Sequence, residues 1–416
     1  MPVRVLVIGG GGREHALAWR LALCPSVEDV SVAPGNPGMG QVARCRSVPL
    51  ADRARLTALA GHERADLVVV GPEEPLCAGL ADHLRSEGLA VLGPSAAAAR
   101  IEGSKAWAMD LCHRHGLPAP RSQVCATPDE ALEVAAAWPL PAVVKADGLA
   151  AGKGVVVAAE RAEVVEAARA LSARGPVVFE EFLEGREVSA FALCDGRTAR
   201  FYGVARDHKR LLSGDLGPMT GGMGAYTPVA DVDAPTLAAI RDILERAVAA
   251  LADEGCPFVG FLFAGLMLTA DGPRVLEFNC RFGDPEAQSL LPQIGGDVAL
   301  EWLAAARGEL GDGQTVLRPG ASFGVVLAAP GYPVAPQLGV PIAGLGPDGQ
   351  IPGYEDVLCF HAATRWDGRW QTAGGRVLTV VGRGGDLARA RERAYAAVEA
   401  VRFPGAQWRP DMGERP

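Results

Sequence analysis

Apolar and polar positions follow two different periods along residues 1–102. Short runs of β-branched residues, typical of buried strands, alternate with stretches whose apolar residues recur at helical spacing. Near-continuous apolar strands joined by helices predict a parallel, doubly wound (Rossmann-like) α/β sheet. The predicted strands are VRVLVIG, VEDVSVAPGN, DLVVVGPEEP and LAVLGPS, and the predicted helices cover about 14–23 and about 76–86.

The pattern changes after residue 102. A helical stretch, GSKAWAMDLCHRHG, ends at Gly116, which is a usual helix-stop signal. Residues 121–187 then combine two strand pairs with two helices, which predicts a small, mobile lid. Antiparallel strands follow, with a long helix over about 234–254 and a strand pair that ends in VLEFN.

The last 90 residues contain several further strands and one amphipathic helix, DLARARERAYAAVEAV. We expect the final stretch, RPDMGERP, to be a loose tail. The chain is therefore predicted to be a multidomain protein of α/β and α+β type. The expected domains are a parallel N-terminal domain over 1–102, a central domain over 103–325 with its lid over about 121–187, and a small mixed domain over 326–416.

Composition narrows the class of protein. Hydrophobic residues make up 49% of the 416 positions and charged residues 21%, as in soluble globular proteins. The net charge of −9 argues against general nucleic-acid binding, which needs a basic surface. Nine scattered cysteines without a Cys-x-x-Cys pair fit reduced thiols. The apolar segment CPFVGFLFAGLML is too short for a membrane helix, so we expect a cytoplasmic protein without membrane contact.

The first candidate site is the glycine turn IGGGGREHALAW after the first strand. Backbone N–H groups and a helix N-terminus would meet there, which suits a phosphate. A dinucleotide site would need a third glycine, where Glu14 or His15 stands, and an acidic residue ending the second strand, where Pro34 stands. Phosphate capture remains open, and so does a turn that simply packs strand on helix.

Two further segments carry charged side chains next to strands. VVKADGLAAGKG places Lys145 and Lys153 around a glycine loop that could hold a polyphosphate, although a surface hairpin with two solvated lysines would look similar. EEFLEGREVS could contact an adenine or ribose through its carboxylates and backbone. Its alternative is a charged strand edge.

VLEFNCRFGDPEAQ carries the most specific chemistry. Glu277 and Asn279 are two apart on a predicted strand, so their oxygens share a face. Two hard oxygen ligands, completed by phosphates and water, suit Mg²⁺. Arg281 continues that face and could bind a carboxylate or phosphate.

Taken together, these segments resemble the phosphoribosylamine–glycine ligase (glycinamide ribonucleotide synthetase) family of the ATP-grasp superfamily. The resemblance runs through nearly the whole chain in order. Its motifs are GGREHALAW, APGN, VVVGPEEPL, GSKA, VKADGLAAGKGV, EEFLEG, DHKR, TGGMGAY, EFNCRFGDPE, GYP, FHA and GGRV.

The resemblance implies ATP-dependent ligation of glycine to 5-phosphoribosylamine in purine biosynthesis, through a glycyl phosphate, with Mg²⁺ or Mn²⁺. No nucleic-acid, membrane or obligate protein partner is expected. By matching motifs, the nucleotide would contact Lys105, Lys145, Lys153, Glu180, Glu181, Phe182, Leu183, Glu187 and Arg210. Glu277 and Asn279 would bind the metal, while Arg281 and Asp207, with Lys145, would serve catalysis. The acceptor would contact Gly10, Gly11, Gly12, Glu14, Asn36, Glu73, Gly375 and Arg376.

Three departures from the family pattern stand out. Gly10 replaces a frequent asparagine, which should leave backbone phosphate binding intact, and Met219 replaces an asparagine near the nucleotide. GFLFAGLML offers no acidic metal ligand of the kind many ATP-grasp relatives have. Three other readings remain: a different ATP-grasp carboxylate ligase, a nicotinamide-dependent oxidoreductase and a non-enzymatic nucleotide-binding regulator.

Overall fold

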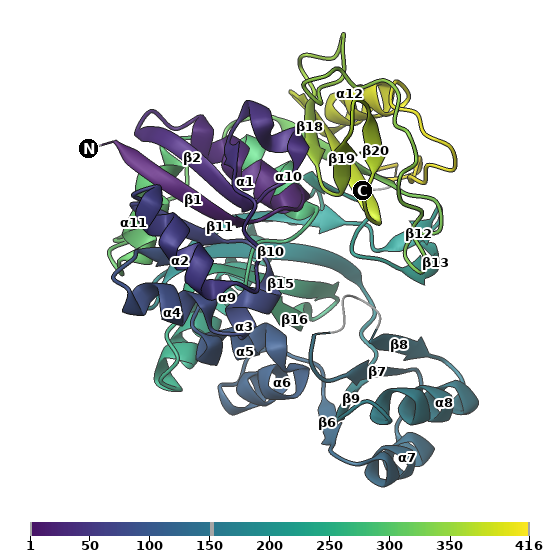
Figure 1. Cartoon of the computed structure of the whole chain (residues 1–416). Coiled ribbons are helices and arrows are strands. Elements are labelled where there is room, and N and C mark those ends of the chain that lie inside the picture. The colour runs from purple at the N-terminus through teal and green to yellow at the C-terminus, as the bar shows by residue number, and fades with distance from the viewer. Residues whose placement is uncertain (1, 150–153, 415–416) are drawn as a thin grey trace.

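The computed structural model describes residues 2–149 and 154–414 (Figure 1). Their strands form a five-stranded parallel sheet at the N-terminus, an eight-stranded antiparallel sheet at the centre, a four-stranded sheet at one end and two small hairpins. No helix of these residues is long and apolar enough to cross a membrane.

The N-terminal sheet has the order β3-β2-β1-β4-β5, and its strands are all parallel as predicted. The helix expected over 76–86 is divided in two, because Gly79 adopts a left-handed φ of +81° between its halves. The strands are β1 (Val3–Gly9), β2 (Val27–Pro34), β3 (Arg44–Cys45), β4 (Leu67–Val70) and β5 (Val91–Leu92). The helices are α1 (Gly12–Ala22), η1 (Pro37–Gln41), α2 (Arg53–His62), α3 (Glu73–Cys77), α4 (Leu80–Ser86), α5 (Ala96–Gly103) and α6 (Lys105–Arg114).

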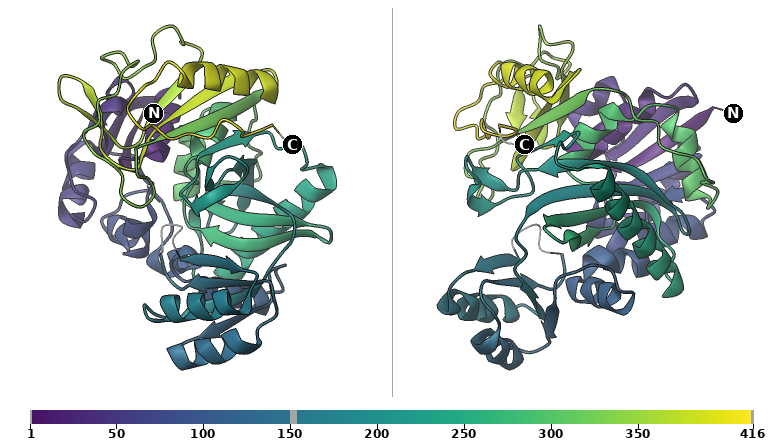
Figure 2. Two further views of the ribbon diagram at one scale, coloured as in Figure 1. Left: turned by 90° about the vertical axis from the view of Figure 1, so that its right-hand side faces the viewer. Right: turned by 180° about the vertical axis from the view of Figure 1, so that it is seen from behind.

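The four-stranded sheet, β6-β9-β7-β8, packs with two helices around a hydrophobic core of its own. At the start of helix α7, Thr127 and Glu130 form a reciprocal capping box, and Pro128 occupies the first turn. Figures 1 and 2 show this unit projecting from the rest of the molecule. Its elements are β6 (Ser122–Cys125), α7 (Pro128–Ala137), β7 (Ala142–Ala146), β8 (Val155–Ala158), α8 (Arg161–Ser172) and β9 (Val177–Glu181).

The central sheet has the order β16-β15-β10-β11-β14-β17-β21-β18 with antiparallel pairing throughout. Strand β17 belongs to this sheet and spans the expected boundary between the central and C-terminal domains, at 325/326. The three-domain division therefore stays a proposal. Its strands are β10 (Arg186–Asp195), β11 (Ala199–Asp207), β14 (Gly224–Thr227), β15 (Val259–Thr269), β16 (Gly272–Asn279), β17 (Ala321–Ala328), β18 (Leu358–His361) and β21 (Arg376–Gly384).

The remaining helices and hairpins surround this sheet. Helix α9 coincides with the predicted helix, and Asp233 caps its N-terminus by accepting from Thr236 N. The helices are α9 (Ala234–Asp253), α10 (Glu286–Leu290), η2 (Leu291–Gln293), α11 (Val298–Ala306) and α12 (Leu387–Val398). The hairpins are β12 (Arg210–Leu212) with β13 (Leu216–Met219), and β19 (Thr364–Trp366) with β20 (Trp370–Thr372).

The N-terminal and central sheets share their hydrophobic cores. Leu6, on one face of β1, belongs to the same cluster as Val188 of the central sheet, while Val5 on the other face belongs with Phe191. Phe282, just beyond β16, stacks on Phe191 with ring centroids 4.7 Å apart. The chain around the EFN strand is therefore fixed against the N-terminal sheet.

The prediction of a loose C-terminal tail over 409–416 is wrong for residues 409–414, whereas 415–416 lie outside the described residues. Arg409 is only 2% exposed and Met412 is fully buried. The segment is held by side chains of α12: Arg391 donates to Met412 O at 2.7 Å and Tyr395 to Arg409 O at 2.6 Å. The position of the segment at the end of the chain predicted a loose tail, but the side chains that hold it lie on α12, which local sequence does not reveal.

Candidate active site

The glycine turn lies at the carboxyl end of β1, and Glu14 fills the space inside it. Its carboxylate accepts from Gly11 N at 2.7 Å and from Arg13 Nε at 2.6 Å, and the residue is 2% exposed. A Cβ on Gly71 would lie 2.1 Å from Glu14 Oε1, and one on Gly9 would lie 2.3 Å from Glu14 Cγ. Glu14 therefore holds the turn from within, and the Gly11 N–H is already engaged.

Asn36 has a similar holding role in the structure. Its Nδ2 donates to Gly10 O at 2.9 Å and to His361 O at 3.0 Å, while its Oδ1 accepts from Gly38 N at 2.9 Å. Both ends of the amide are thus engaged by backbone. Asn36 ties the glycine turn to η1 and to the C-terminal strand β18.

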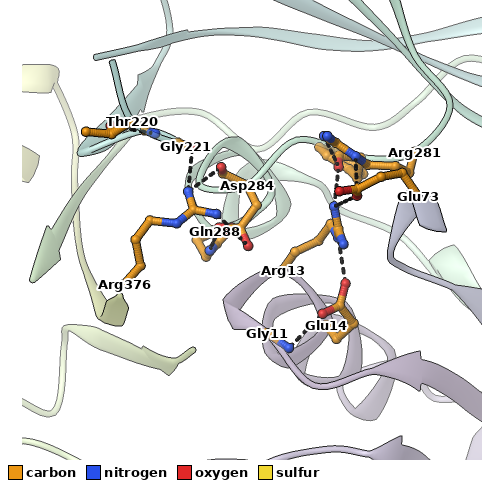
Figure 3. A network of polar contacts seen from close by, with 12 residues as sticks. Gly11, Arg13, Glu14, Glu73, Thr220, Gly221, Arg281, Asp284, Gln288 and Arg376 are labelled. Carbon is orange, nitrogen blue, oxygen red and sulfur yellow. Dashed lines mark hydrogen bonds and ion pairs between the residues drawn. The ribbon is translucent and has the colours of Figure 1, made fainter. Parts of the chain in front are cut away.

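A chain of alternating charges runs from the glycine turn to the end of β16 (Figure 3). Arg13 Nη1 lies 3.8 Å from Glu73 Oε2, which in turn lies 3.2 Å from Arg281 Nε. Arg281 Nη2 lies 2.8 Å from Glu102 Oε1. Burial opposes the charge of Arg281, yet the carboxylates of Glu102 and Glu73 outweigh it and raise the arginine pKa.

The sequence analysis missed Glu102 as part of this chain. Its second oxygen accepts from Cys280 N at 2.8 Å, directly after Asn279. Burial raises the pKa of the Glu102 carboxyl despite Arg281. Only its place two residues before Ser104, the N-cap of α6, hinted at a position near the site.

Asp284 and Gln288, also missed, face the glycine turn from the opposite side (Figure 3). Asp284 Oδ2 lies 3.7 Å from where a Cβ on Gly11 would stand. Gln288 Nε2 donates to Asp284 Oδ1 at 2.7 Å, and its buried Oε1 has no hydrogen-bond partner among the described residues. Their signal in the sequence was the GDPEAQ run after the EFN strand.

Arg376 joins the same corner from β21. Its Nη1 donates to Asp284 O at 2.6 Å and to Gly221 O at 2.5 Å, and its Nη2 lies 3.3 Å from Asp284 Oδ2. A Cβ on the preceding Gly375 would lie 2.4 Å from the ring of Tyr332, whose hydroxyl oxygen accepts from Gly221 N at 3.0 Å. The GGRV segment is thus packed against the TGGMGA loop.

Lys145, at the end of β7, is nearly buried between two partners. Its Nζ lies 2.8 Å from Glu180 Oε2 and donates to Leu276 O at 2.9 Å. Leu276 is the extra residue of a bulge in β16 between Val275 and Glu277, which frees its carbonyl from the ladder. Burial raises the pKa of Glu180 against the pull of Lys145.

Lys105 lies at the start of α6 and donates from Nζ to Gly148 O at 2.8 Å. Burial lowers the pKa of this lysine. Lys105 thus reaches the backbone of the glycine loop after β7. Lys153, expected to bind nucleotide from the same loop, lies outside the described residues.

Glu277 faces the lysines from β16. Lys209 Nζ lies 3.7 Å from Glu277 Oε1 and 3.1 Å from Glu187 Oε2. Burial alone would raise the pKa of Glu277, but Lys209, Lys145 and Lys105 outweigh it and keep the carboxylate ionised. A lysine ammonium therefore stands near the carboxylate that we expected to bind a cation.

Asn279 lies two residues beyond Glu277 on β16, with buried Phe278 between them on the opposite face. Gly265 pairs with Glu277 across the sheet, so the neighbouring strand contributes no carboxylate opposite it. No group of three or more His, Cys, Asp or Glu side chains in the described ranges could hold a metal ion. The donor set present fits a cation that takes two protein oxygens and completes its shell elsewhere.

Asp207 ends β11 next to this cluster. Burial raises its pKa to about 8, against the pull of Lys209 and helped by the carboxylates of Glu286, Glu187 and Glu277. Glu286, at the start of α10, accepts from Ser189 Oγ at 3.0 Å and also has a pKa raised by burial. Half-buried Asp207 and buried Glu286 thus lie beside the lysines without a full set of cationic partners.

The other expected nucleotide residues are less directed toward this cluster. Glu181 Oε1 pairs with Arg274 at 2.7 Å. Phe182 is 38% exposed and Leu183 is buried. Arg210 donates to Gly217 O at 2.8 Å within its own hairpin.

Comparisons with known proteins agree along the whole chain. Residues 3–102, 103–287 and 322–415 match the N domain, the ATP-grasp (A) domain and the C domain of phosphoribosylglycinamide synthetase. The chain belongs to the phosphoribosylamine–glycine ligase family. Curated members from Caulobacter vibrioides and Streptomyces coelicolor are 47% and 48% identical to it, each match covering 99% of this chain and 98% and 99% of the relative.

Solved structures agree on the fold. The phosphoribosylamine–glycine ligase of Thermotoga maritima superposes with a TM-score of 0.85 at 34% identity, covering 98% of this chain and 100% of that one. A biotin carboxylase domain from Hydrogenobacter thermophilus, in complex with MgADP, ADP and bicarbonate, gives a TM-score of 0.74 at 17% identity, covering 97% and 91%. The second likeness concerns the fold alone. The expected architecture and family membership are thereby confirmed.

Proposed function

We propose that the protein catalyses the ATP-dependent ligation of glycine to 5-phosphoribosylamine, yielding glycinamide ribonucleotide, ADP and phosphate. Family membership over the whole chain supports this activity. The observation that carries it in the structure is the meeting of Lys145, Glu277 and Arg281 at one edge of the central sheet. Phosphoryl transfer to a carboxylate needs mainly positioning and charge neutralisation, which such groups supply.

ATP would bind with its phosphates along Lys105 and Lys145. The ammonium group of Lys105 interacts with the Glu277 carboxylate, and that of buried Lys145 pairs with Glu180. Glu277 and Asn279 would hold Mg²⁺, and Mn²⁺ would suit the same oxygens. When bound, the metal supplies neutralisation of charge on the phosphate oxygens. Lys209, whose Nζ lies 3.7 Å from Glu277 Oε1 without the metal, would then pair with its other carboxylate partner, Glu187.

Glycine would lie between Arg281 and Asp207. The guanidinium suits its carboxylate, and the half-buried carboxyl of Asp207 suits its ammonium group. Because the pKa of Asp207 is raised to about 8 in the absence of ligand, a bound ammonium would favour the ionised form. The glycine carboxylate oxygen then attacks the γ-phosphorus, the bond to the β,γ-bridging oxygen breaks, and ADP leaves.

The acceptor would lie at the glycine turn, next to Glu73, Asp284 and Arg376. The N-terminus of α1 and Arg376 would receive its phosphate. The lack of a side chain at Gly10, Gly12 and Gly375 lets Gly35, Gln288 and Tyr332 pack closely beside them. Its amine attacks the acyl carbon of glycyl phosphate, phosphate leaves and the nitrogen loses a proton. In this proposal Glu14 and Asn36 shape the turn rather than contact the acceptor.

The test is ADP formation by the purified protein with ATP, Mg²⁺ and glycine, measured with and without 5-phosphoribosylamine. We expect ADP release that requires both substrates, and a product with the mass of glycinamide ribonucleotide. ADP formation that does not depend on the acceptor amine would rule out this activity.

A further inference from the structure

The C-terminal tail, residues 407–414, binds the hairpin β12–β13, which lies far from it in the sequence. Arg409 donates from Nε to Asp411 Oδ1 at 3.0 Å and from Nη2 to Asp411 Oδ2 at 2.7 Å, so the two side chains form a forked pair. The remaining guanidinium nitrogen, Nη1, donates to Asp215 Oδ1 at the tip of the hairpin. Arg409 is therefore the link between the tail and the hairpin.

Asp411 forms a second contact between the tail and the hairpin. Its Oδ2 accepts from Gly214 N at 2.8 Å. Burial alone would raise the pKa of Asp411, but Arg409 and the backbone N–H of Gly214 hold it well below its usual range. The carboxylate thus stays charged at any working pH.

The hairpin tip needs such support. Asp215 has a left-handed φ of +56°, which is uncommon for a residue with a side chain, and its side chain is 69% exposed. The adjacent Leu212 and Leu216 are 52% and 64% exposed, so the hairpin has little core of its own. A two-stranded hairpin of this kind is marginally stable alone.

The root of the hairpin is part of the candidate active site. Lys209, next to Arg210, contacts Glu187 and Glu277. Thr220, after β13, donates from N and from Oγ1 to Lys209 O at 2.8 Å in each case. Figures 1 and 2 show the hairpin between the C-terminal elements and the four-stranded unit that carries Lys145.

The tail is itself anchored firmly enough to act as a support. Gln407 pairs with Ala328 of β17 through two backbone hydrogen bonds, of 2.8 and 2.9 Å. Beyond it, Arg391 and Tyr395 of α12 hold the backbone at Arg409 and Met412. Contacts therefore run without a break from helix α12 through the tail to the hairpin.

We propose that residues 407–414 form a clamp that holds the hairpin over the nucleotide end of the active site, with Arg409 and Asp411 as positioning residues for ATP. This inference rests on the proposed function for its assignment to ATP. The clamp acts only through the hairpin, so its loss weakens ATP binding while leaving glycine and the acceptor bound as before.

The sharpest variant is Asp215→Asn, since asparagine tolerates the left-handed backbone and loses only the charge that Arg409 binds. Asp411→Asn and Arg409→Met weaken the clamp from the tail side. Matched controls are Asp356→Asn and Arg389→Met, whose side chains make exposed surface pairs elsewhere in the C-terminal region. For each protein, kcat and the KM of each substrate are measured, and melting is recorded.

We expect the KM for ATP to rise about 3-fold in Asp215→Asn and about 10-fold in Arg409→Met, with the other two KM values within about 2-fold of wild type. Chymotrypsin should cleave the clamp variants faster after Leu212 and Leu216, and a non-hydrolysable ATP analogue should restore protection. Both controls should behave like wild type.

Two results would overturn the clamp. One is an unchanged ATP KM together with unchanged cleavage in all three variants, and the other is a parallel change of every kinetic constant with a lowered melting temperature, as a purely structural role predicts. The cleavage assay does not depend on turnover. If wild type lacks acceptor-dependent ADP formation but the variants open at Leu212 and Leu216, the proposed function fails while the clamp stands.

Discussion

The nucleotide end and the acceptor end of the site are built in opposite ways. At the nucleotide end, Lys145, Lys209 and Glu277 come from separate elements, and their charges are only partly matched with one another. At the acceptor end, Glu14 and Asn36 have their polar atoms engaged inside the protein. At the nucleotide end a ligand can complete the pairing of charges, whereas at the acceptor end Glu14 and Asn36 are already held in place by the protein.

A polar residue in a motif can therefore be there to hold the site rather than to touch the substrate. Buried charges that lack a full set of partners cost free energy, which a charged ligand can recover. Fully paired groups gain no such free energy from a ligand. Substitutions should therefore change ligand binding and turnover at the nucleotide end, and stability first at the acceptor end.

The largest effect should come from Glu277→Ala. This change removes the carboxylate that three lysines keep ionised and that we assign to the metal, so we expect kcat/KM to fall by at least about 100-fold with little loss of stability. ADP release measured over a range of Mg²⁺ concentrations checks this.

Glu166→Ala is the matched control, since Glu166 is exposed on α8. It should keep wild-type turnover. If Glu277→Ala retained near-normal activity at limiting Mg²⁺, the assignment of this carboxylate to the metal would be wrong.

The sequence patterns predicted where these residues lie along the strands better than they predicted which contacts the side chains make. The period of two along β16 placed Glu277 and Asn279 on one face, as the structure has them. The contact of Lys145 with Leu276 O depends on a bulge that arises only when β15 and β16 pair. Local spacing carries no information on such a pairing.

The acceptor end shows the same limit more clearly. The glycine turn after β1 was predicted, but Glu14 turns inward because Gly71, at the end of β4, leaves room for its carboxylate. Likewise, Arg281 meets Glu102 and Glu73 only because the N-terminal and central sheets share a core. Contacts between distant segments decide which polar residues remain available to a ligand.

At the acceptor end, the inward-facing carboxylate of Glu14 is the residue to change. Glu14→Ala removes the nearer partner of a buried ion pair and leaves Arg13 with its 3.8 Å contact to Glu73, so we expect a loss of about 3 kcal/mol in the free energy of unfolding. The KM for 5-phosphoribosylamine should rise and that for ATP should stay the same. Denaturant unfolding and substrate titrations measure both.

The matched control is Glu28→Ala, which breaks an exposed pair with Arg4 and should cost under about 1 kcal/mol. Should Glu14→Ala unfold like wild type and lose only acceptor binding, Glu14 would be a substrate ligand after all. The contrast between the two ends would then not hold.

The third prediction concerns pH. His15 accepts from His361 N at 2.9 Å, and burial lowers its pKa from 6.5 to about 3. Between these values the unfolded chain binds a proton that the folded protein excludes, so the stability present above pH 6.5 is lost as pH falls. We expect a lower melting temperature at pH 5 than at pH 7.

His15→Asn should reduce that pH dependence, although His361, whose pKa burial also lowers, keeps part of it. The exposed His62 serves as control, and His62→Asn should leave the melting profile unchanged. An identical pH profile for wild type and His15→Asn would show that this histidine does not titrate on unfolding.

The smallest effect is expected for Met219→Asn, which restores the polar residue usual in this family opposite Arg210 on the hairpin. One added hydrogen bond to the nucleotide should lower the KM for ATP about 2-fold to 3-fold. Leu216→Asn, at an exposed position of the same hairpin, is the control. An ATP KM that stays the same or rises would show that residue 219 does not face the nucleotide.

The most direct test of the two-ended site is a crystal structure with a non-hydrolysable ATP analogue and Mg²⁺. We expect a metal bound by oxygens of Glu277 and Asn279, triphosphate contacts to Lys145, and a glycine turn free of nucleotide with Glu14 still turned inward. A nucleotide whose phosphates lie on the turn at Gly10–Gly12 would contradict it.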